Sequence, residues 1–251
     1  MAAIAAEAGA LAMARWGDFS QWDKTPGNPV SDVDLAVNAL LKARLAALDP
    51  DAGWLSEETA DNPDRLAKAR LWVVDPIDGT RDYVRRRPGW AVSIALVEDG
   101  RVVVGVLDAP AVGKAWQAVR GGGARCNGAP IRVGNRTEFA GARVPADQLP
   151  RPDSDLVLVP KPNSIALRIA MVAADEADLV ATLRWGYEWD IAAAALIAEE
   201  AGATVTDAFG EPLAFNTPSA QAFGVLATAP GIHAAAVARL ADRAREFAGQ
   251  R

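Results

Sequence analysis

The chain has 251 residues, of which 51% are hydrophobic and 23% charged, and its formal net charge is −6. This composition is typical of a globular protein with enough apolar material for one large domain or two packed ones. The negative charge argues against binding to a nucleic acid polymer, which requires a basic face.

Cysteine content and hydropathy indicate the cellular compartment that is expected for the protein. Cys126 is the only cysteine, so no intrachain disulfide can form and a reducing environment is expected. The alanine-rich N-terminal segment lacks the basic region of a signal peptide, and no apolar run is long enough to cross a membrane. We therefore predict a soluble, cytoplasmic protein with no membrane association.

Two helices are predicted at the start of the chain. Apolar residues recur at helical spacing over residues 2–15 and again over residues 32–47. Between them lies a polar stretch punctuated by Gly and Pro, residues 17–32, which predicts an exposed loop.

A run of strands follows the second helix. A short extended segment, residues 53–58, carries two adjacent acids, of which only one can face a given site. A short helix then precedes a buried apolar strand at residues 71–74. Alternating apolar residues separated by Gly turns predict an antiparallel meander. Its strands are expected at residues 90–97, 102–107, 115–119 and 131–133.

The pattern loosens between residues 134 and 152, where we place a domain boundary. The two predicted domains are residues 1–140 and 141–251. In the second domain, strands alternate with helices. The expected strands are residues 156–159, 179–183, 204–206 and 223–227, and the expected helices are residues 165–174, 191–201 and 231–247.

The segment Asp75-Pro76-Ile77-Asp78-Gly79-Thr80 follows directly on the buried strand. Its proline fixes φ and its glycine permits a sharp bend, so both aspartates and the Ile77 carbonyl can face one point. Clustered hard oxygen ligands favour Mg²⁺ or Mn²⁺ over zinc. Taken alone, such an Asp-rich turn is more often an ordinary strand cap.

Four acids from distant parts of the chain are expected at the ends of elements: Glu57, Asp75, Asp78 and Asp190. If these carboxylates converged without a cation, they would repel one another and raise one another's pKa. Divalent ions remove that conflict, and two or three such ions form a site suited to phosphate ester hydrolysis.

These motifs resemble the inositol monophosphatase superfamily, the Mg²⁺-dependent, lithium-sensitive phosphomonoesterases. Asp75 to Thr80 matches the signature D-P-x-D-G-T, and Trp189-Asp190 followed by alanines matches W-D-x-A-A. Residues 30–34 stand in place of V-T-x-x-D, and Ser56-Glu57-Glu58 in place of G-E-E, with serine replacing the usual glycine. The resemblance runs in order along nearly the whole chain.

The resemblance implies a fold and an assembly. The family fold is a layered α-β-α-β-α sandwich, with an α+β N-terminal half, an α/β C-terminal half and the metal site between them. Homodimers are usual in the family. The expected substrate is a small phosphorylated metabolite.

The resemblance also implies residue roles. Glu57, Asp75 and the Ile77 carbonyl would hold one Mg²⁺, and Asp75, Asp78 and Asp190 a second. A third ion is possible, with Lys24 near it or near the phosphate. Glu57 and Thr80 would orient the attacking water, and Asp34 would support Thr80. The expected substrate contacts are Asp78, Gly79, Thr80, Lys161, Ser164 and Asp190.

Arg81-Asp82-Tyr83 after the signature is closer to the bisphosphate nucleotidase branch than to the usual T-N-F of inositol monophosphatases. Lys161 and the helix capped by Ser164 are candidates for a second phosphate, although ordinary capping explains Ser164 equally well. We therefore expect a 3′(2′),5′-bisphosphate nucleotide as substrate. Inositol 1-phosphate is the alternative, with histidinol phosphate, sugar bisphosphates and a non-catalytic regulatory role further alternatives.

Overall fold

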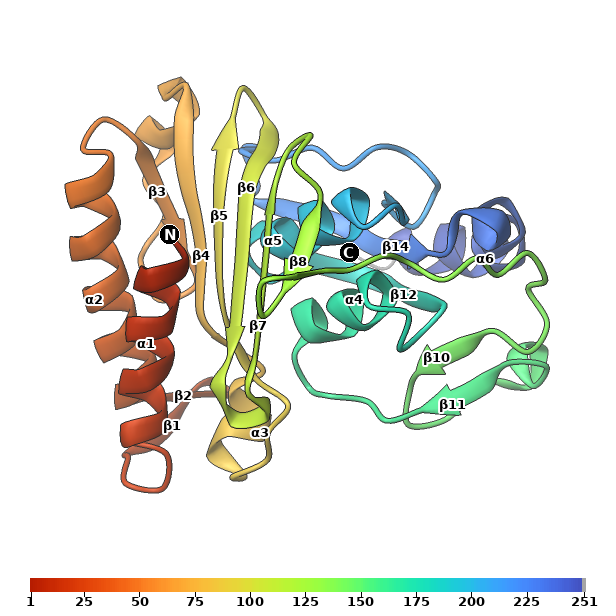
Figure 1. Ribbon diagram of the computed structural model, residues 1–251, viewed down its shortest axis with the longest axis horizontal. Helices are drawn as coiled ribbons and strands as arrows, with labels where there is room; N and C mark the ends of the chain where they lie inside the picture. The colour runs from red at the N-terminus through yellow and green to blue at the C-terminus, as the bar shows by residue number, and fades with distance from the viewer. Residues whose placement is uncertain (250–251) are drawn as a thin grey trace.

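Helices α1 (Ala2–Ala14) and α2 (Asp32–Leu48) form the outer layer on one face of a large sheet (Figure 1). The computed structural model describes residues 1–249. The buried face of α1 consists of Ala5, Ala8, Gly9 and Ala12, and these small side chains let the helix lie close to the sheet.

Residues 17–32, predicted as a loop, contain a β-hairpin. Strands β1 (Gln21–Thr25) and β2 (Asn28–Ser31) pair in antiparallel fashion around a turn at Gly27, where φ is +77°. Every residue of β1 is exposed, so the strand buries no apolar side chain. Without a buried face there is no alternating pattern to reveal the strand, and the prediction of a loop was wrong for this reason.

The large sheet has seven strands in the order β3-β4-β5-β6-β7-β8-β9. Strands β3 and β4 are parallel, and the remaining neighbours are antiparallel, which confirms the predicted meander. The strands are β3 (Gly53–Ser56), β4 (Arg70–Asp78), β5 (Ala91–Glu98), β6 (Arg101–Ala109), β7 (Lys114–Val119), β8 (Ala124–Cys126) and β9 (Ala129–Pro130).

The predicted strand at residues 131–133 is wrong. The chain leaves the sheet there, because the Val133 amide donates to the Ala201 carbonyl at the end of α5 rather than to a neighbouring strand. A short helix, α3 (Thr80–Val84), follows β4 and was not predicted. The short helix expected before β4 is the 3₁₀ helix η1 (Pro63–Ala67).

Helices α4 (Ile165–Ala173) and α5 (Glu188–Glu200) form the central layer, behind the large sheet (Figure 1). The alanine run of α5 is fully buried because this helix packs between two sheets. At its crossing with β6 a Cβ on Gly105 would lie 2.6 Å from the Ala193 carbonyl oxygen. Only small residues allow this close approach.

The second sheet has the order β12-β14-β13, and α6 (His233–Ala248) covers its outer face (Figure 1). Its strands are β12 (Leu179–Tyr187), β13 (Thr204–Thr206) and β14 (Gln221–Thr228). A small parallel pair, β10 (Arg143–Pro145) and β11 (Val157–Val159), lies beside β12. The remaining 3₁₀ turns are η2 (Pro110–Val112), η3 (Arg151–Asp153) and η4 (Pro230–Ile232).

The layers therefore follow the order α-β-α-β-α, as predicted. Over residues 1–249, none of the helices combines the length and the apolar character needed to span a membrane.

Candidate active site

Strand β4 ends in a β-bulge that carries two of the predicted acids. Asp75 pairs with Ser93 and Asp78 pairs with Ala91, so three steps along β4 oppose two along β5. Such a bulge re-aims the side chains around it. Both aspartates are buried, and Asp75 Oδ1 accepts a hydrogen bond of 3.0 Å from the Ile77 amide.

Gly79 turns the chain from the bulge into helix α3. Its φ of +94° lies in the left-handed region, and a Cβ there would approach the Gly89 carbonyl oxygen to 2.6 Å. Glycine is therefore required at this position for both conformational and steric reasons.

Thr80, the first residue of α3, is joined to the predicted residue Asp34. Its Oγ1 lies 3.1 Å from Asp34 Oδ1 and 3.0 Å from the Ile77 carbonyl oxygen, so the hydroxyl proton is donated to one of these acceptors. Asp34 Oδ2 accepts a hydrogen bond from the Ser31 amide. Burial raises the pKa of Asp34 to about 6. Above that pH the carboxylate is mainly ionised and can accept the Thr80 proton.

Asp78 lies at the N-terminus of α4. Its Oδ2 accepts hydrogen bonds from Ser164 Oγ and from the Ala166 amide, the latter at 2.7 Å. Burial raises the pKa of Asp78 to about 6, although these hydrogen bonds oppose the shift. Ser164 is fully buried, and its Oγ also accepts from the Leu167 amide at 2.9 Å. Ser164 thus supports Asp78 and caps α4 in this structure.

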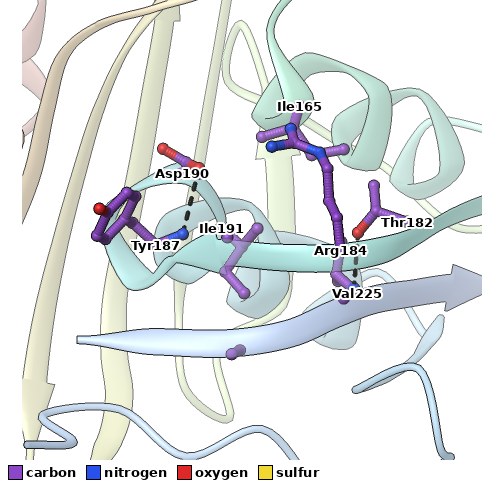
Figure 2. Close-up of a pocket in the computed structure, with 10 residues that line it drawn as sticks. Ile165, Thr182, Arg184, Tyr187, Asp190, Ile191 and Val225 are labelled. Atoms are coloured by element: carbon purple, nitrogen blue, oxygen red, sulfur yellow. Dashed lines mark hydrogen bonds between the residues drawn. The ribbon is translucent and has the colours of Figure 1, made fainter. Parts of the chain in front are cut away.

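Asp190 comes from the first turn of α5, and its Oδ2 lies 3.4 Å from the Tyr187 amide nitrogen (Figure 2). Burial, followed by the carboxylates of Asp78 and Glu57, raises the pKa of Asp190 to about 8. Burial and the charges of Glu57 and Asp78 likewise raise the pKa of Asp75 well above its ordinary value. The four acids therefore act on one another electrostatically.

Glu57 follows β3 and lines the same cleft as the three aspartates. Lys24, on the β1–β2 hairpin, places its Nζ 2.7 Å from Glu57 Oε1 and 2.7 Å from Glu58 Oε1. An ammonium group therefore holds both neighbouring glutamates, of which Glu57 lines the cleft.

The donor chemistry of the site fits a divalent cation. Within residues 1–249, no three His, Cys, Asp or Glu side chains are grouped tightly enough to form a ready-made metal cluster. However, the acids supply only carboxylate oxygens, which are the preferred ligands of Mg²⁺ and Mn²⁺. The pKa values of Asp75, Asp78 and Asp190 are all raised in the absence of a cation, which is the conflict that a bound cation would relieve.

The acids line a cleft of about 660 Å³ that basic side chains also line. Its basic wall is formed by Lys161, Arg168 and Arg184. Lys161 forms an ion pair with Asp147. Arg184 of β12 and Asp190 of α5 project to the same side, as Figure 2 shows. The aromatic rings of Tyr187 and Trp189 stack at the rim with their centroids 4.3 Å apart.

Sequence reasoning missed the two arginines of this wall. Arg168 lies one helical turn after Ser164, a spacing that places it on the same side of α4, so helical periodicity could have found it. Arg184 has no such signal, because it lies beyond the apolar run that predicted the strand.

The triplet Arg81-Asp82-Tyr83 has structural contacts of its own. Arg81 donates to the Gly27 carbonyl at 2.6 Å, and Asp82 accepts from the Asn163 amide at 3.0 Å. Tyr83 is fully buried and donates to the Ala12 carbonyl at 2.8 Å. Of the three, only Arg81 lines the cleft.

Comparisons with known proteins agree with this geometry. The sequence model of the inositol monophosphatase family matches residues 1–246. A fructose-1,6-bisphosphatase/inositol-1-monophosphatase of Thermotoga maritima is 32% identical over 219 residues, covering 81% of each chain. A histidinol-phosphatase of Chlorobaculum parvum is 33% identical over 221 residues, covering 81% of this chain and 83% of that protein. The solved structure of a Thermotoga maritima IMPase superposes with a TM-score of 0.84 at 27% identity, covering 98% of this chain and 96% of that one.

Proposed function

The chain belongs to the inositol monophosphatase family and is thus a phosphoric monoester hydrolase, and we propose that the acid-lined cleft is its metal-dependent active site. The proposed ligands of two or three Mg²⁺ ions, with Mn²⁺ as an alternative, are Glu57, Asp75, the Ile77 carbonyl, Asp78 and Asp190. Divalent ions, when bound, neutralise charge on the phosphate and make water a stronger nucleophile at neutral pH.

The residues of the chain position the water and the ester. Asp34 Oδ1 accepts the Thr80 proton, which leaves a lone pair of Thr80 Oγ1 to accept a hydrogen bond from the attacking water. Glu57 accepts the second hydrogen of that water. The backbone amides of Gly79 and Thr80, at the turn that only glycine can form, bind the phosphate oxygens.

One observation carries this proposal. Acids from the end of β3, the β4 bulge and α5 share one cleft, and the Thr80–Asp34 pair lies beside them. Burial, followed by neighbouring carboxylates, raises the pKa values of Asp75 and Asp190. Clustered carboxylates repel one another and lower the stability of the folded state. A reaction that depends on a bound cation accounts for keeping them together. A regulatory protein without turnover has no need of all these residues.

The substrate is a small phosphate monoester. The activities for which the relatives are named make inositol 1-phosphate, fructose 1,6-bisphosphate and histidinol phosphate the first candidates. The expected bisphosphate nucleotide gains no support from these relatives. Arg81, Asp82 and Tyr83, on which that expectation drew, are held by contacts to Gly27, Asn163 and Ala12.

The test is phosphate release with Mg²⁺ and its loss on chelation. We expect Asp78→Asn and Asp190→Asn to lower kcat/KM by about a thousandfold, because each removes a carboxylate from the ion site. Asp51→Asn, an exposed aspartate in the turn after α2, is the matched control and should behave as wild type.

A second measurement does not depend on activity. Mg²⁺ should raise the Tm of the wild type and of Asp51→Asn, because it binds only the folded state, and should raise that of Asp78→Asn much less. An Asp78→Asn protein that keeps both Mg²⁺-dependent turnover and the full Tm shift would contradict the assignment. Absence of turnover with every ester would favour the regulatory alternative. Adding Li⁺ to the same assays tests the expected lithium sensitivity.

The proposal includes two further predictions, on domain organisation and on oligomeric state. The first is a division into residues 1–140 and 141–251, with the site between them. The second is a homodimer, which sedimentation equilibrium would test.

A further inference from the structure

Arg184 is an exposed cation that faces the cleft, and its charge opposes the upward pKa shift of Asp190. It projects from β12 to the same side as Asp190 of α5, and it lines both the acid-containing cleft and a second, small pocket (Figure 2). Among residues 1–249, no side chain or carbonyl forms a hydrogen bond or ion pair with its guanidinium, and Asp190 is no exception.

The other cations of the cleft are already engaged. Arg81 donates to the Gly27 carbonyl and Lys161 pairs with Asp147. The Arg168 guanidinium donates to the carbonyls of Pro162 and Asn163. Among the described cations of this wall, Arg184 is thus the one with its full donor capacity available to a ligand.

The surroundings of Arg184 favour the binding of an anion beside it. Ile165, at the start of α4, lines the same small pocket and offers the guanidinium no acceptor (Figure 2). Arg168 is close enough that the charge of Arg184 contributes, after burial, to lowering the pKa of Arg168. Two neighbouring guanidinium groups repel each other, and an anion between them would convert that repulsion into attraction.

We propose that Arg184 is a specificity-determining residue that binds a second anionic group, a phosphate or a carboxylate, on the leaving alcohol of the substrate. This inference rests on the proposed function, since the scissile phosphate must lie at the acids for the leaving alcohol to reach Arg184. A cleft of about 660 Å³ has room for a small doubly anionic ester. Arginine suits this task because its planar fork matches phosphate and carboxylate oxygens.

The test uses esters that differ only in the second anion. Fructose 1,6-bisphosphate is compared with fructose 1-phosphate, and 3-phosphoglycerate with glycerol 3-phosphate, so that the pairs separate a second phosphate from a carboxylate. We expect the wild type to favour the doubly anionic member of at least one pair by about tenfold or more in kcat/KM. Arg184→Gln should reduce that preference by about tenfold to a hundredfold, and Arg184→Lys by less.

Arg101→Gln is the matched control. Arg101 is exposed at the start of β6, where it lies opposite Glu98 of β5 in the strand ladder. The acids of the β4 bulge lie at the other end of these strands. This variant makes the same charge change and should keep the preference of the wild type. If the wild type shows no preference, or if Arg184→Gln keeps it, the proposal is overturned.

A binding measurement separates this inference from the proposed function. With Ca²⁺ replacing Mg²⁺, isothermal titration gives the affinity for each ester without relying on turnover. If no ester is hydrolysed, the proposed function fails. Weaker binding of fructose 1,6-bisphosphate to Arg184→Gln, with fructose 1-phosphate less affected, would still support the anion contact. Equal loss for both esters would overturn it.

Discussion

At the residue scale, Glu57 and Glu58 are adjacent in sequence but differ in their surroundings. The Glu57 side chain lines the cleft with Asp75 and keeps 21% of its surface exposed. The Glu58 side chain is 4% exposed and does not line the cleft, and its amide donates to Ser56 Oγ at 3.4 Å. Lys24 contacts both, so the ion pair alone does not distinguish them.

This difference predicts unequal effects of two matched substitutions. Glu57→Gln should lower kcat/KM by about a thousandfold, because it removes a charge that faces the reacting groups. Glu58→Gln should lower it by less than about tenfold, because only the Lys24 contact changes. Initial rates at saturating Mg²⁺ measure both values. Equal decreases in kcat/KM would mean that both glutamates are required at the site, held together by Lys24.

At the element scale, a buried network joins the segment after β3 to the start of α5. Arg65 of η1 has a side chain that is 1% exposed, and it donates to Asp61, to Asn216 Oδ1 at 2.8 Å and to the Thr217 carbonyl at 2.9 Å. The amides of Asn216 and Thr217 donate in turn to Glu188, the first residue of α5, at 2.7 and 2.8 Å. The network thus links the elements that carry Glu57 and Asp190.

Breaking this network should affect both stability and turnover. Arg65→Leu leaves buried acceptors unpaired, and we expect the free energy of unfolding to fall by about 3 kcal/mol. We also expect kcat/KM to fall, because Glu57 and Asp190 lose a common support. Arg70→Leu breaks an ion pair with Asp49 in which the arginine side chain is 46% exposed, and should cost less than about 1 kcal/mol. Urea unfolding measures both. Similar decreases in unfolding free energy for the two variants would show that the Arg65 network contributes no more to stability than an exposed ion pair.

The same scale explains what sequence reasoning could and could not find. The acids of the β4 bulge follow a buried apolar strand and carry a motif, so their placement was predictable. Arg184 was not, because β12 continues to Tyr187, well past the apolar run that predicted it. The pairing of β12 with β14 also shifts between Thr182 and Trp185. Strand alternation cannot be carried across such an irregularity, so the side on which Arg184 emerges depends on tertiary structure.

At the scale of the whole molecule, the layer order was expected from the family resemblance, whereas hydrophobic periodicity predicted most of the elements that form the layers. The alanine-rich α5 reads as buried on all sides, which is what a helix between two sheets requires. The exposed strand β1 buries no apolar side chain and left no such pattern. Elements that bury apolar side chains were predictable from hydrophobic periodicity, whereas exposed elements were not.

Packing of the outer layer also half-buries one carboxylate that has no part in the site. Helix α1 crosses β6 at Gly9, where an added Cβ would lie 2.0 Å from Asp108 Oδ2. Within residues 1–249 no hydrogen bond or ion pair is formed by the Asp108 side chain. Burial raises the pKa of Asp108 from 3.8 to about 6. The ionised form is therefore disfavoured in the folded state, which makes global stability depend on pH.

The direction of that dependence follows from the shift. A carboxyl group with a raised pKa in the folded protein stabilises it fully below about pH 4 and loses this contribution as pH rises through about 6. The full shift corresponds to about 3 kcal/mol, which solvent screening of a half-buried group reduces to about 1–2 kcal/mol. Asp108→Asn, which cannot ionise, should exceed the wild type in unfolding free energy by this amount at pH 7.5 and by almost nothing at pH 4. Urea unfolding at the two pH values, with Asp51→Asn as the exposed control, measures the difference. A gain that is the same at both pH values would mean that Asn improves the packing under α1 and that ionisation of Asp108 is not the cause.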